Sequence, residues 1–142
     1  MKKTYIFFAS LLIFIFVCSC NAKEIKNIEK NEVAVNKKKS YISVSMEQGL
    51  KMMSSEDNFI LLDVRRDDEY ASGHIPGAIL LTNETMTKSE TEKIIPNKEI
   101  AVFVYCRSGR RSKEAAKKLV DYGYTNVTEI GGILDYSGKT EK

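Results

Sequence analysis

Short apolar runs alternate with amphipathic stretches along the chain from residue 41 onward. Runs rich in β-branched and aromatic residues predict two buried strands, over residues 58–64 (NFILLDV) and 100–105 (IAVFVY). Three shorter strands are predicted over residues 41–44, 78–81 and 126–130. Strands that alternate with helices are typical of a parallel sheet with helices on its faces, so the pattern predicts an α/β domain.

Helices are predicted between these strands, where apolar residues recur at helical spacing. Ser45 is the expected N-cap of the first helix, with Gln48 as its capping-box partner and Met46, Leu50 and Met53 on the apolar face. The other helices are predicted over residues 67–71, 90–95 and 112–122, with a last helical piece ending near Tyr136. Cysteine 106 thus falls between the most apolar strand and the longest helix.

The first residues of the chain predict export. Lys2 and Lys3 form a basic n-region, and an apolar h-region follows over residues 5–17. This run is shorter than the roughly 20 residues that a membrane-spanning helix needs. Residues 1–19 are therefore expected to be a cleaved signal peptide.

The end of this segment, Val17-Cys18-Ser19-Cys20, resembles a lipobox. Cys20 fits the lipidated position because Ser19 before it is small, whereas Cys18 fits poorly because the bulky Val17 would occupy that small site. The alternative is an ordinary secretory signal that ends in cysteines. Residues 20–40 show no periodicity and are expected to be a tether, and residues 41–142 are expected to be the folded domain.

Composition and charge narrow the class of function. The whole chain has 142 residues and a net charge of +3, which falls to +1 when the signal peptide removes Lys2 and Lys3. A domain this close to neutral is not expected to bind nucleic acid. The length leaves room for one globular core, and no second domain is expected.

Cys106 is expected to be the one free thiol of the processed protein, because Cys18 leaves with the signal peptide and Cys20 is alkylated. It stands between a buried strand and a Gly-containing loop that opens a helix. Three arginines share that loop: Arg107, Arg110 and Arg111. Backbone N–H groups, the positive end of the helix dipole and the guanidinium groups all favour the thiolate, so the pattern predicts a reactive cysteine rather than an inert buried one.

The chain resembles the rhodanese family in four blocks that occur in register between residues 42 and 136. The blocks are Leu62-Asp63-Val64-Arg65 with Glu69-Tyr70; Gly73-His74-Ile75-Pro76-Gly77-Ala78; Val104-Tyr105-Cys106-Arg107-Ser108-Gly109-Arg110-Arg111-Ser112 with Ala115-Ala116 and Leu119; and Gly123-Tyr124-Asn126-Val127 with Gly131-Gly132. The resemblance implies a three-layer domain, in which a central, mainly parallel five-stranded sheet is flanked by helices.

The resemblance also implies an activity, that of a thiosulfate sulfurtransferase in which Cys106 carries sulfur as a persulfide. The donor is expected to be a small anion such as thiosulfate, and the acceptor a thiol or cyanide. The loop residues expected to bind the substrate and cradle its outer sulfur are Arg107, Ser108, Gly109, Arg110 and Arg111. No metal and no organic cofactor is expected, and the domain is expected to be a monomer.

Other residues of the matching blocks are expected to have supporting roles. Asp63 and Arg65 leave a buried strand and are expected to form an ion pair or hydrogen bond that supports the loop. His74 belongs to a turn and is not expected to transfer protons. Tyr136 stands where the family usually has Trp, which predicts an intact fold with a thinner C-terminal edge.

Two other functions are compatible with a reactive cysteine in this setting. A cysteine-dependent phosphatase or arsenate reductase would place an arginine six positions after the nucleophile, but that position is Ser112 and Arg111 comes one residue early. A non-enzymatic carrier or sensor of sulfane sulfur would keep the same loop. The sequence favours sulfurtransfer over the first of these and leaves the second open.

The lipobox yields a first prediction, that the protein is exported and attached to the bacterial cell envelope through a lipid on Cys20. If the cell has two membranes, Asn21 after the lipidated cysteine favours the periplasmic face of the outer membrane. Cys20→Ala should then accumulate an unprocessed precursor without lipid, as seen by gel mobility and metabolic labelling with a fatty acid. Normal processing and membrane retention of this variant would contradict the lipoprotein prediction.

Overall fold

The computed structural model describes residues 40–142. The predicted signal peptide, the lipidation site at Cys20 and the tether up to residue 39 lie outside the described residues, and those predictions stay predictions. Over residues 40–142, no helix has the length and apolar character that a membrane crossing requires.

Five strands form a single sheet in which every neighbouring pair is parallel, in the order β1-β5-β4-β2-β3. The strands are β1 (Ile42–Ser43), β2 (Phe59–Asp63), β3 (Ile79–Leu80), β4 (Ala101–Cys106) and β5 (Val127–Gly132). β4 lies in the middle of the sheet and all of its residues are buried. The predicted five-stranded α/β fold is confirmed, and the sheet is parallel throughout.

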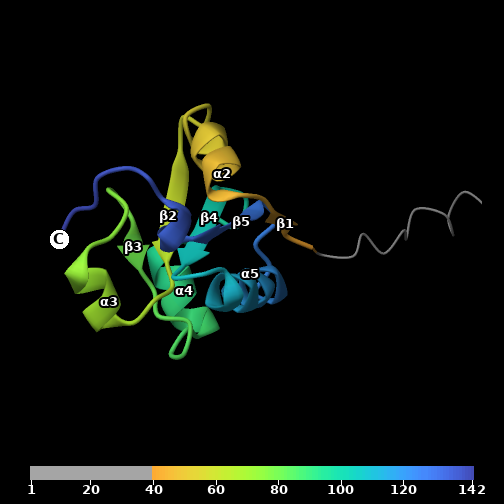
Figure 1. Cartoon of the computed structure of the whole chain (residues 1–142). Coiled ribbons are helices and arrows are strands. Elements are labelled where there is room, and N and C mark those ends of the chain that lie inside the picture. The colour runs from red at the N-terminus through yellow and green to blue at the C-terminus, as the bar shows by residue number, and fades with distance from the viewer. Residues whose placement is uncertain (1–39) are drawn as a thin grey trace, which may run out of the picture. The chain divides into compact units, whose positions relative to one another are not determined.

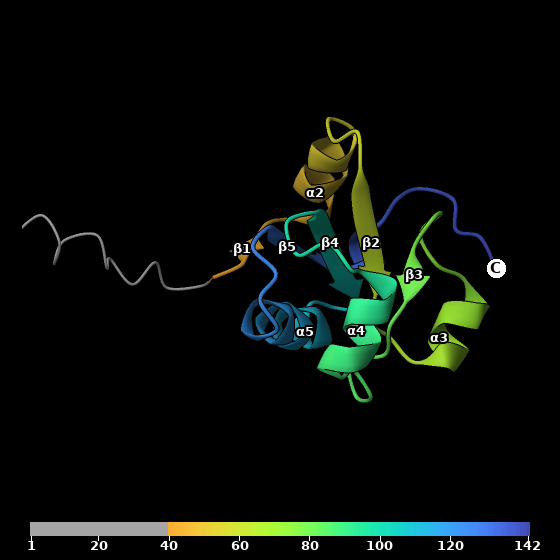
Figure 2. The same cartoon turned by 180° about the vertical axis from the view of Figure 1, so that it is seen from behind.

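Helices cover both faces of the sheet, which gives the three layers visible in Figures 1 and 2. The helices are α2 (Met46–Met53), α3 (Asp67–Ser72), α4 (Lys88–Ile94), α5 (Arg110–Asp121) and the 3₁₀ turn η1 (Ile133–Asp135). α2 lies on one face, α4 and α5 lie on the other, and α3 lies near the edge formed by β3 (Figure 1).

The alternation of side chains along β4 divides the core into two clusters. Val104 and Cys106 pack on the face that α5 covers, together with Leu62 and Leu119. Phe103 and Tyr105 pack on the other face with residues of α2. Because β4 is buried on both faces, its sequence is a continuous apolar run. This run is the feature from which the strand could be predicted.

Two helices begin earlier than the sequence pattern predicted. α5 starts at Arg110 and not at Ser112, because Gly109 adopts a positive φ of 96° and caps the helix directly after the turn. α4 starts at Lys88 and not at residue 90, because Thr87 forms a capping box with Glu90. Charged residues in the first turn of each helix resembled loop residues in the sequence. The capping box of α2, between Ser45 and Gln48, is confirmed.

The chain after β5 passes the cluster on the α2 side and ends beside the turn at residues 73–77. The last helical piece is the short 3₁₀ turn η1, and Tyr136 follows it, half-buried against the cluster on the α2 side. Farther on, the backbone of Glu141 exchanges two hydrogen bonds with His74. Tyr136 thus occupies an apolar position in the fold, and the C-terminal residues close over the turn at residues 73–77.

The packing of α2 on β5 yields a second prediction. A Cβ atom at Gly49 would lie 2.3 Å from Cγ2 of Ile130, which is fully buried. Gly49→Ala should therefore lower the free energy of unfolding by about 1–3 kcal/mol, even though Ala is favoured over Gly in a helix by about 1 kcal/mol. Urea denaturation measures this change. Lys51→Ala on the exposed face of α2 is the control and should change stability by less than about 0.5 kcal/mol. A more stable Gly49→Ala protein would contradict the close contact between α2 and β5.

Candidate active site

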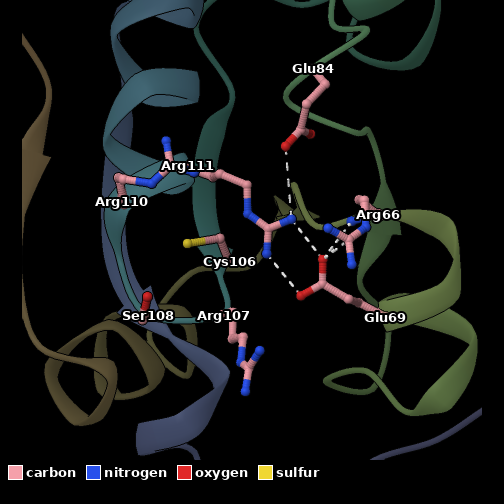
Figure 3. A pocket seen from close by; sticks show the side chains of 8 residues that line it. All are labelled: Arg66, Glu69, Glu84, Cys106, Arg107, Ser108, Arg110 and Arg111. Atoms are coloured by element: carbon pink, nitrogen blue, oxygen red, sulfur yellow. Dashed lines mark hydrogen bonds and ion pairs between the residues drawn. The ribbon is translucent and has the colours of Figure 1, made fainter.

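Cys106 is the last residue of β4, at the carboxyl edge of the sheet, where the chain turns into α5. The residue is only 1% exposed, yet it lines a pocket of about 230 Å³. The pocket is bordered by charged and polar side chains: Arg66, Glu69, Glu84, Arg107, Ser108, Arg110 and Arg111 (Figure 3). The thiol therefore lies between the apolar cluster under α5 and a polar pocket.

The turn between β4 and α5 directs backbone donors at the sulfur. The Gly109 N–H donates a hydrogen bond to Cys106 Sγ over 3.1 Å. The turn lies close against the end of β5, since a Cβ at Gly132 would lie 2.3 Å from the carbonyl oxygen of Arg107. The first turn of α5 starts directly after this point, so the positive end of the helix dipole lies at the thiol.

The pKa of the Cys106 thiol reflects opposing effects. Burial raises it. The Ser112 hydroxyl lowers it when its proton is directed at the sulfur, the backbone N–H groups of Ser112, Ser108 and Gly109 lower it as well, and the net pKa lies below the ordinary value. The leading causes of the lowering are thus hydrogen bonds and not the arginines of the loop. The thiolate is the form that attacks an electrophilic sulfur, so the site favours nucleophilic chemistry.

Arg111 points into the pocket and is bound by a carboxylate from another part of the chain. Its Nη1 and Nη2 lie 2.6 and 2.8 Å from the two carboxylate oxygens of Glu69 in α3, and Glu84 lies 3.9 Å from Nη1 (Figure 3). The hydrogen bond from Arg111 lowers the pKa of Glu69 to about 2. This pair links α3 to α5 and occupies much of the donor capacity that the sequence analysis assigned to substrate binding.

The other arginines of the pocket are more exposed. Arg110 pairs with Glu114 one helical turn away, and Arg66 lies near Asp68 at the start of α3. Over residues 40–142, no carboxylate forms an ion pair with Arg107. Four guanidinium groups and two carboxylates border the pocket, so its net charge is positive and suits an anion.

Sequence reasoning gave no role to three residues of the pocket: Arg66, Glu69 and Glu84. A signal existed for the first two, because the segments that follow parallel strands β2 and β4 meet at the carboxyl edge of the sheet. Glu69 also lies in one of the blocks that carry the family resemblance. Nothing local in the sequence marks Glu84, which reaches the pocket from the loop before α4.

Asp63 and Arg65 form a buried ion pair beside the site and do not line the pocket. Arg65 Nη2 lies 2.6 Å from Asp63 Oδ2 and also donates to the carbonyl oxygen of Gly73. The Tyr105 hydroxyl donates to Asp63 over 2.7 Å and accepts the Ile75 N–H. The network fixes the residue that precedes Cys106 and ties it to the turn that starts at Gly73.

His74, the one histidine of the chain, lies outside the pocket. Its ring stacks on Tyr70 with the centroids 3.7 Å apart, and its Nε2 lies 3.5 Å from Glu141. In the described range 40–142, no group of three or more His, Cys, Asp or Glu residues is arranged to hold a metal ion.

Comparison with known proteins places this geometry in a family. Residues 45–139 match the family model of the rhodanese-like domain. Over 98 residues the chain is 32% identical to the thiosulfate sulfurtransferase PspE of Escherichia coli (strain K12), a match that covers 69% of this chain and 90% of PspE. It is also 32% identical over 99 residues to YrkF of Bacillus subtilis (strain 168), by name a sulfur carrier protein, which covers 69% of this chain but only 52% of YrkF.

A solved structure agrees with the fold described above. The chain aligns with a structure titled as a rhodanese with anions from E. coli, with a TM-score of 0.54 and 34% identity. The alignment covers 58% of this chain and 96% of the other. The family resemblance seen in the four sequence blocks is thereby confirmed.

The pair formed by Glu69 and Arg111 yields a third prediction. Because the pKa of Glu69 falls from 4.5 to about 2 in the folded protein, the stability that this carboxylate contributes is present above about pH 4.5 and is lost as the pH falls toward 2. Glu69→Gln should lower the free energy of unfolding at pH 7 by about 1.5–3 kcal/mol, and the difference from the unmodified protein should shrink below pH 4.5.

Urea denaturation at several pH values between 3 and 7 measures this dependence. Glu56→Gln is the matched control, because Glu56 is exposed and its substitution should change stability by less than about 0.5 kcal/mol. A difference between Glu69→Gln and the unmodified protein that stayed constant across this range would contradict a charge-dependent contribution from Glu69.

Proposed function

Because the chain belongs to the rhodanese-like domain family, we propose that it is a thiosulfate sulfurtransferase in which Cys106 carries the transferred sulfur as a persulfide. The observation that carries this proposal is the turn from β4 into α5, which brings a backbone N–H to 3.1 Å from the Cys106 sulfur at the base of a positively charged pocket. Two relatives support the same chemistry: PspE of E. coli, which is named a thiosulfate sulfurtransferase, and YrkF of B. subtilis, whose name is that of a sulfur carrier protein.

The proposed reaction has two displacements at sulfur. In the first, the Cys106 thiolate attacks the outer sulfur of thiosulfate, the S–S bond of the donor breaks, and sulfite leaves with the bonding electron pair. In the second, a nucleophilic acceptor such as cyanide or a thiol attacks the outer sulfur of the persulfide, and the Cys106 thiolate is released. The scheme uses no metal and no organic cofactor.

We assign different parts to the residues around the pocket. Arg107 and Arg110 are exposed at its border and would attract the anionic donor and stabilise the departing sulfite. The amides of Ser108 and Gly109 would hold the sulfur. Arg111, bound to Glu69, would fix the loop while adding positive charge. Asp63 and Arg65 would hold the end of β4 in place through the hydrogen bond between Asp63 and Tyr105.

The alternatives differ in what the site would need. A cysteine-dependent phosphatase or arsenate reductase would need an arginine six positions after Cys106. That position is the buried Ser112, and no observation favours this chemistry. A carrier of sulfane sulfur would form the same persulfide without rapid discharge to a small acceptor. We further propose, from the sequence pattern alone, that a lipid on Cys20 attaches the domain to the cell envelope.

The fourth prediction tests whether Cys106 is the residue that holds the transferred sulfur. The protein incubated with thiosulfate should gain the mass of one sulfur atom, which cyanide should then remove as thiocyanate. Cys106→Ser should show neither the mass gain nor thiocyanate production while keeping its far-UV circular dichroism, because a serine hydroxyl is nearly isosteric but does not ionise near neutral pH.

The same assay separates the alternatives. A mass gain without catalytic thiocyanate production would indicate a carrier and contradict the enzymatic part of the proposal. Hydrolysis of p-nitrophenyl phosphate without sulfur uptake would contradict sulfurtransfer altogether. Sulfur uptake that survives in Cys106→Ser would contradict the assignment of the nucleophile.

A further inference from the structure

Glu129 in β5 is a buried acid to which the proposed reaction gives no part. The residue is 1% exposed, and its Oε1 accepts hydrogen bonds from Ser112 Oγ over 2.7 Å and from the Gly131 N–H over 2.8 Å. On its other oxygen it accepts a hydrogen bond from Ser43 in β1. Within residues 40–142, no Lys, Arg or His forms an ion pair with this carboxylate. A negative group held by three neutral donors thus lies behind the Cys106 loop.

Ser112 connects this carboxylate to the thiol. Its hydroxyl lies 2.7 Å from Glu129 Oε1 and 3.5 Å from Cys106 Sγ, and the carbonyl oxygen of Gly109 lies 2.9 Å away. A hydroxyl has a single proton, so it can donate to only one of these acceptors at a time. A carboxylate is the strongest acceptor among them, and the distance of 2.7 Å to Glu129 is the shortest of the three.

The direction of this hydrogen bond determines whether the Cys106 sulfur faces a hydrogen-bond donor or an acceptor on Ser112. While Ser112 donates to Glu129, its oxygen presents only lone pairs to Cys106. A neutral S–H can donate to such an oxygen, whereas a thiolate gains no hydrogen bond from it. The negative charge of Glu129 acts in the same direction, because a nearby like charge disfavours an anion.

We propose that the buried carboxylate of Glu129 is a positioning group, which acts through the Ser112 hydroxyl to raise the proton affinity of the Cys106 sulfur. It opposes the Gly109 N–H and the dipole of α5, which favour the anion. The inference rests on the proposed function only in taking Cys106 as the reacting sulfur.

The consequence for sulfurtransfer follows from the chemistry of thiolates. A thiolate of higher proton affinity is a stronger nucleophile toward sulfur, and it is a poorer leaving group. Once Cys106 is deprotonated, Glu129 therefore favours the first displacement, in which Cys106 takes up sulfur, over the second, in which Cys106 departs. This bias suits a protein that is loaded by a weakly reactive donor and keeps its sulfur until an acceptor arrives.

The other charged groups near the sulfur lie on different sides of it. Those that border the pocket are Arg66, Glu69, Glu84, Arg107, Arg110 and Arg111. From β2, the Asp63–Arg65 pair faces Tyr105, whose side chain packs on the opposite face of the sheet from that of Cys106. Glu129 does not line the pocket, so its substitution changes the surroundings of the thiol without changing the charges that meet a substrate.

The test is the pH dependence of Cys106 alkylation in the full-length chain. Iodoacetamide labelling can be read specifically for this residue by mass spectrometry, because trypsin releases it in the peptide of residues 99–107. Glu129→Gln keeps the shape and the acceptor oxygen but removes the charge. We expect the midpoint of its labelling curve to fall by about one pH unit.

Two further variants locate the effect. Ser43→Ala removes another hydrogen bond to the same carboxylate but leaves the link to Ser112, and it should not lower the midpoint. In a Ser112→Ala background, Glu129→Gln should shift the midpoint by less than half as much as it does alone. An unchanged or raised midpoint in Glu129→Gln would overturn the proposal, and an equal shift in the Ser112→Ala background would overturn the route through the hydroxyl.

Unfolding cannot imitate the expected result. An unfolded thiol titrates near its ordinary value of about 8.5, so loss of structure would raise the midpoint and not lower it. If Glu129→Gln does not fold by circular dichroism, Glu129→Leu replaces the charge with apolar atoms of similar volume and is measured instead. The assay contains no sulfur donor, so its outcome is independent of whether sulfurtransfer itself is observed.

Discussion

The turn from β4 into α5 is the constraint on which the rest of the site depends. Gly109 adopts a φ of 96° there, a conformation that a side chain would strain, and its N–H points at the Cys106 sulfur. The start of a helix leaves N–H groups without partners in the helix, and a buried anion satisfies them. The same turn thus ends the strand, caps the helix and creates a place where a thiolate is stable.

Three residues from two elements, α3 and β5, hold this turn in place. Glu69 in α3 binds Arg111 from the pocket side, Glu129 in β5 binds Ser112 from the interior, and Gly132 allows the backbone of the loop to lie against β5. Two of these supports are carboxylates. The loop at this positively charged pocket is therefore fixed by carboxylates that are hydrogen-bonded within the fold, while Arg107 at its border forms no ion pair among residues 40–142.

The fold and the nucleophile could be predicted from the sequence because their signals are local. β4 and β2 are apolar on both faces, and Cys106 ends β4 three residues before Gly109. The roles of Glu69, Glu129 and Ser112 could not be predicted in this way, because they depend on contacts between residues that lie 42 and 17 positions apart in the sequence. Arg111 shows the limit of local reading: its position beside Cys106 indicated substrate binding, whereas its partner 42 residues away gives it a structural bond.

The balance of charges around Cys106 also bears on which chemistry the site suits. Phosphoryl transfer requires positive groups that surround the three equatorial oxygens of the transition state. Here a serine bound to a carboxylate stands at the position that would have to supply such a group, so the interior side of the loop is negative and not positive. Sulfurtransfer places no such demand on position 112, and the Gly109 N–H on the other side of the loop already donates to the Cys106 sulfur. The arrangement of Ser112 and Glu129 is thus compatible with a sulfur carried on Cys106 and unfavourable for a bound phosphate.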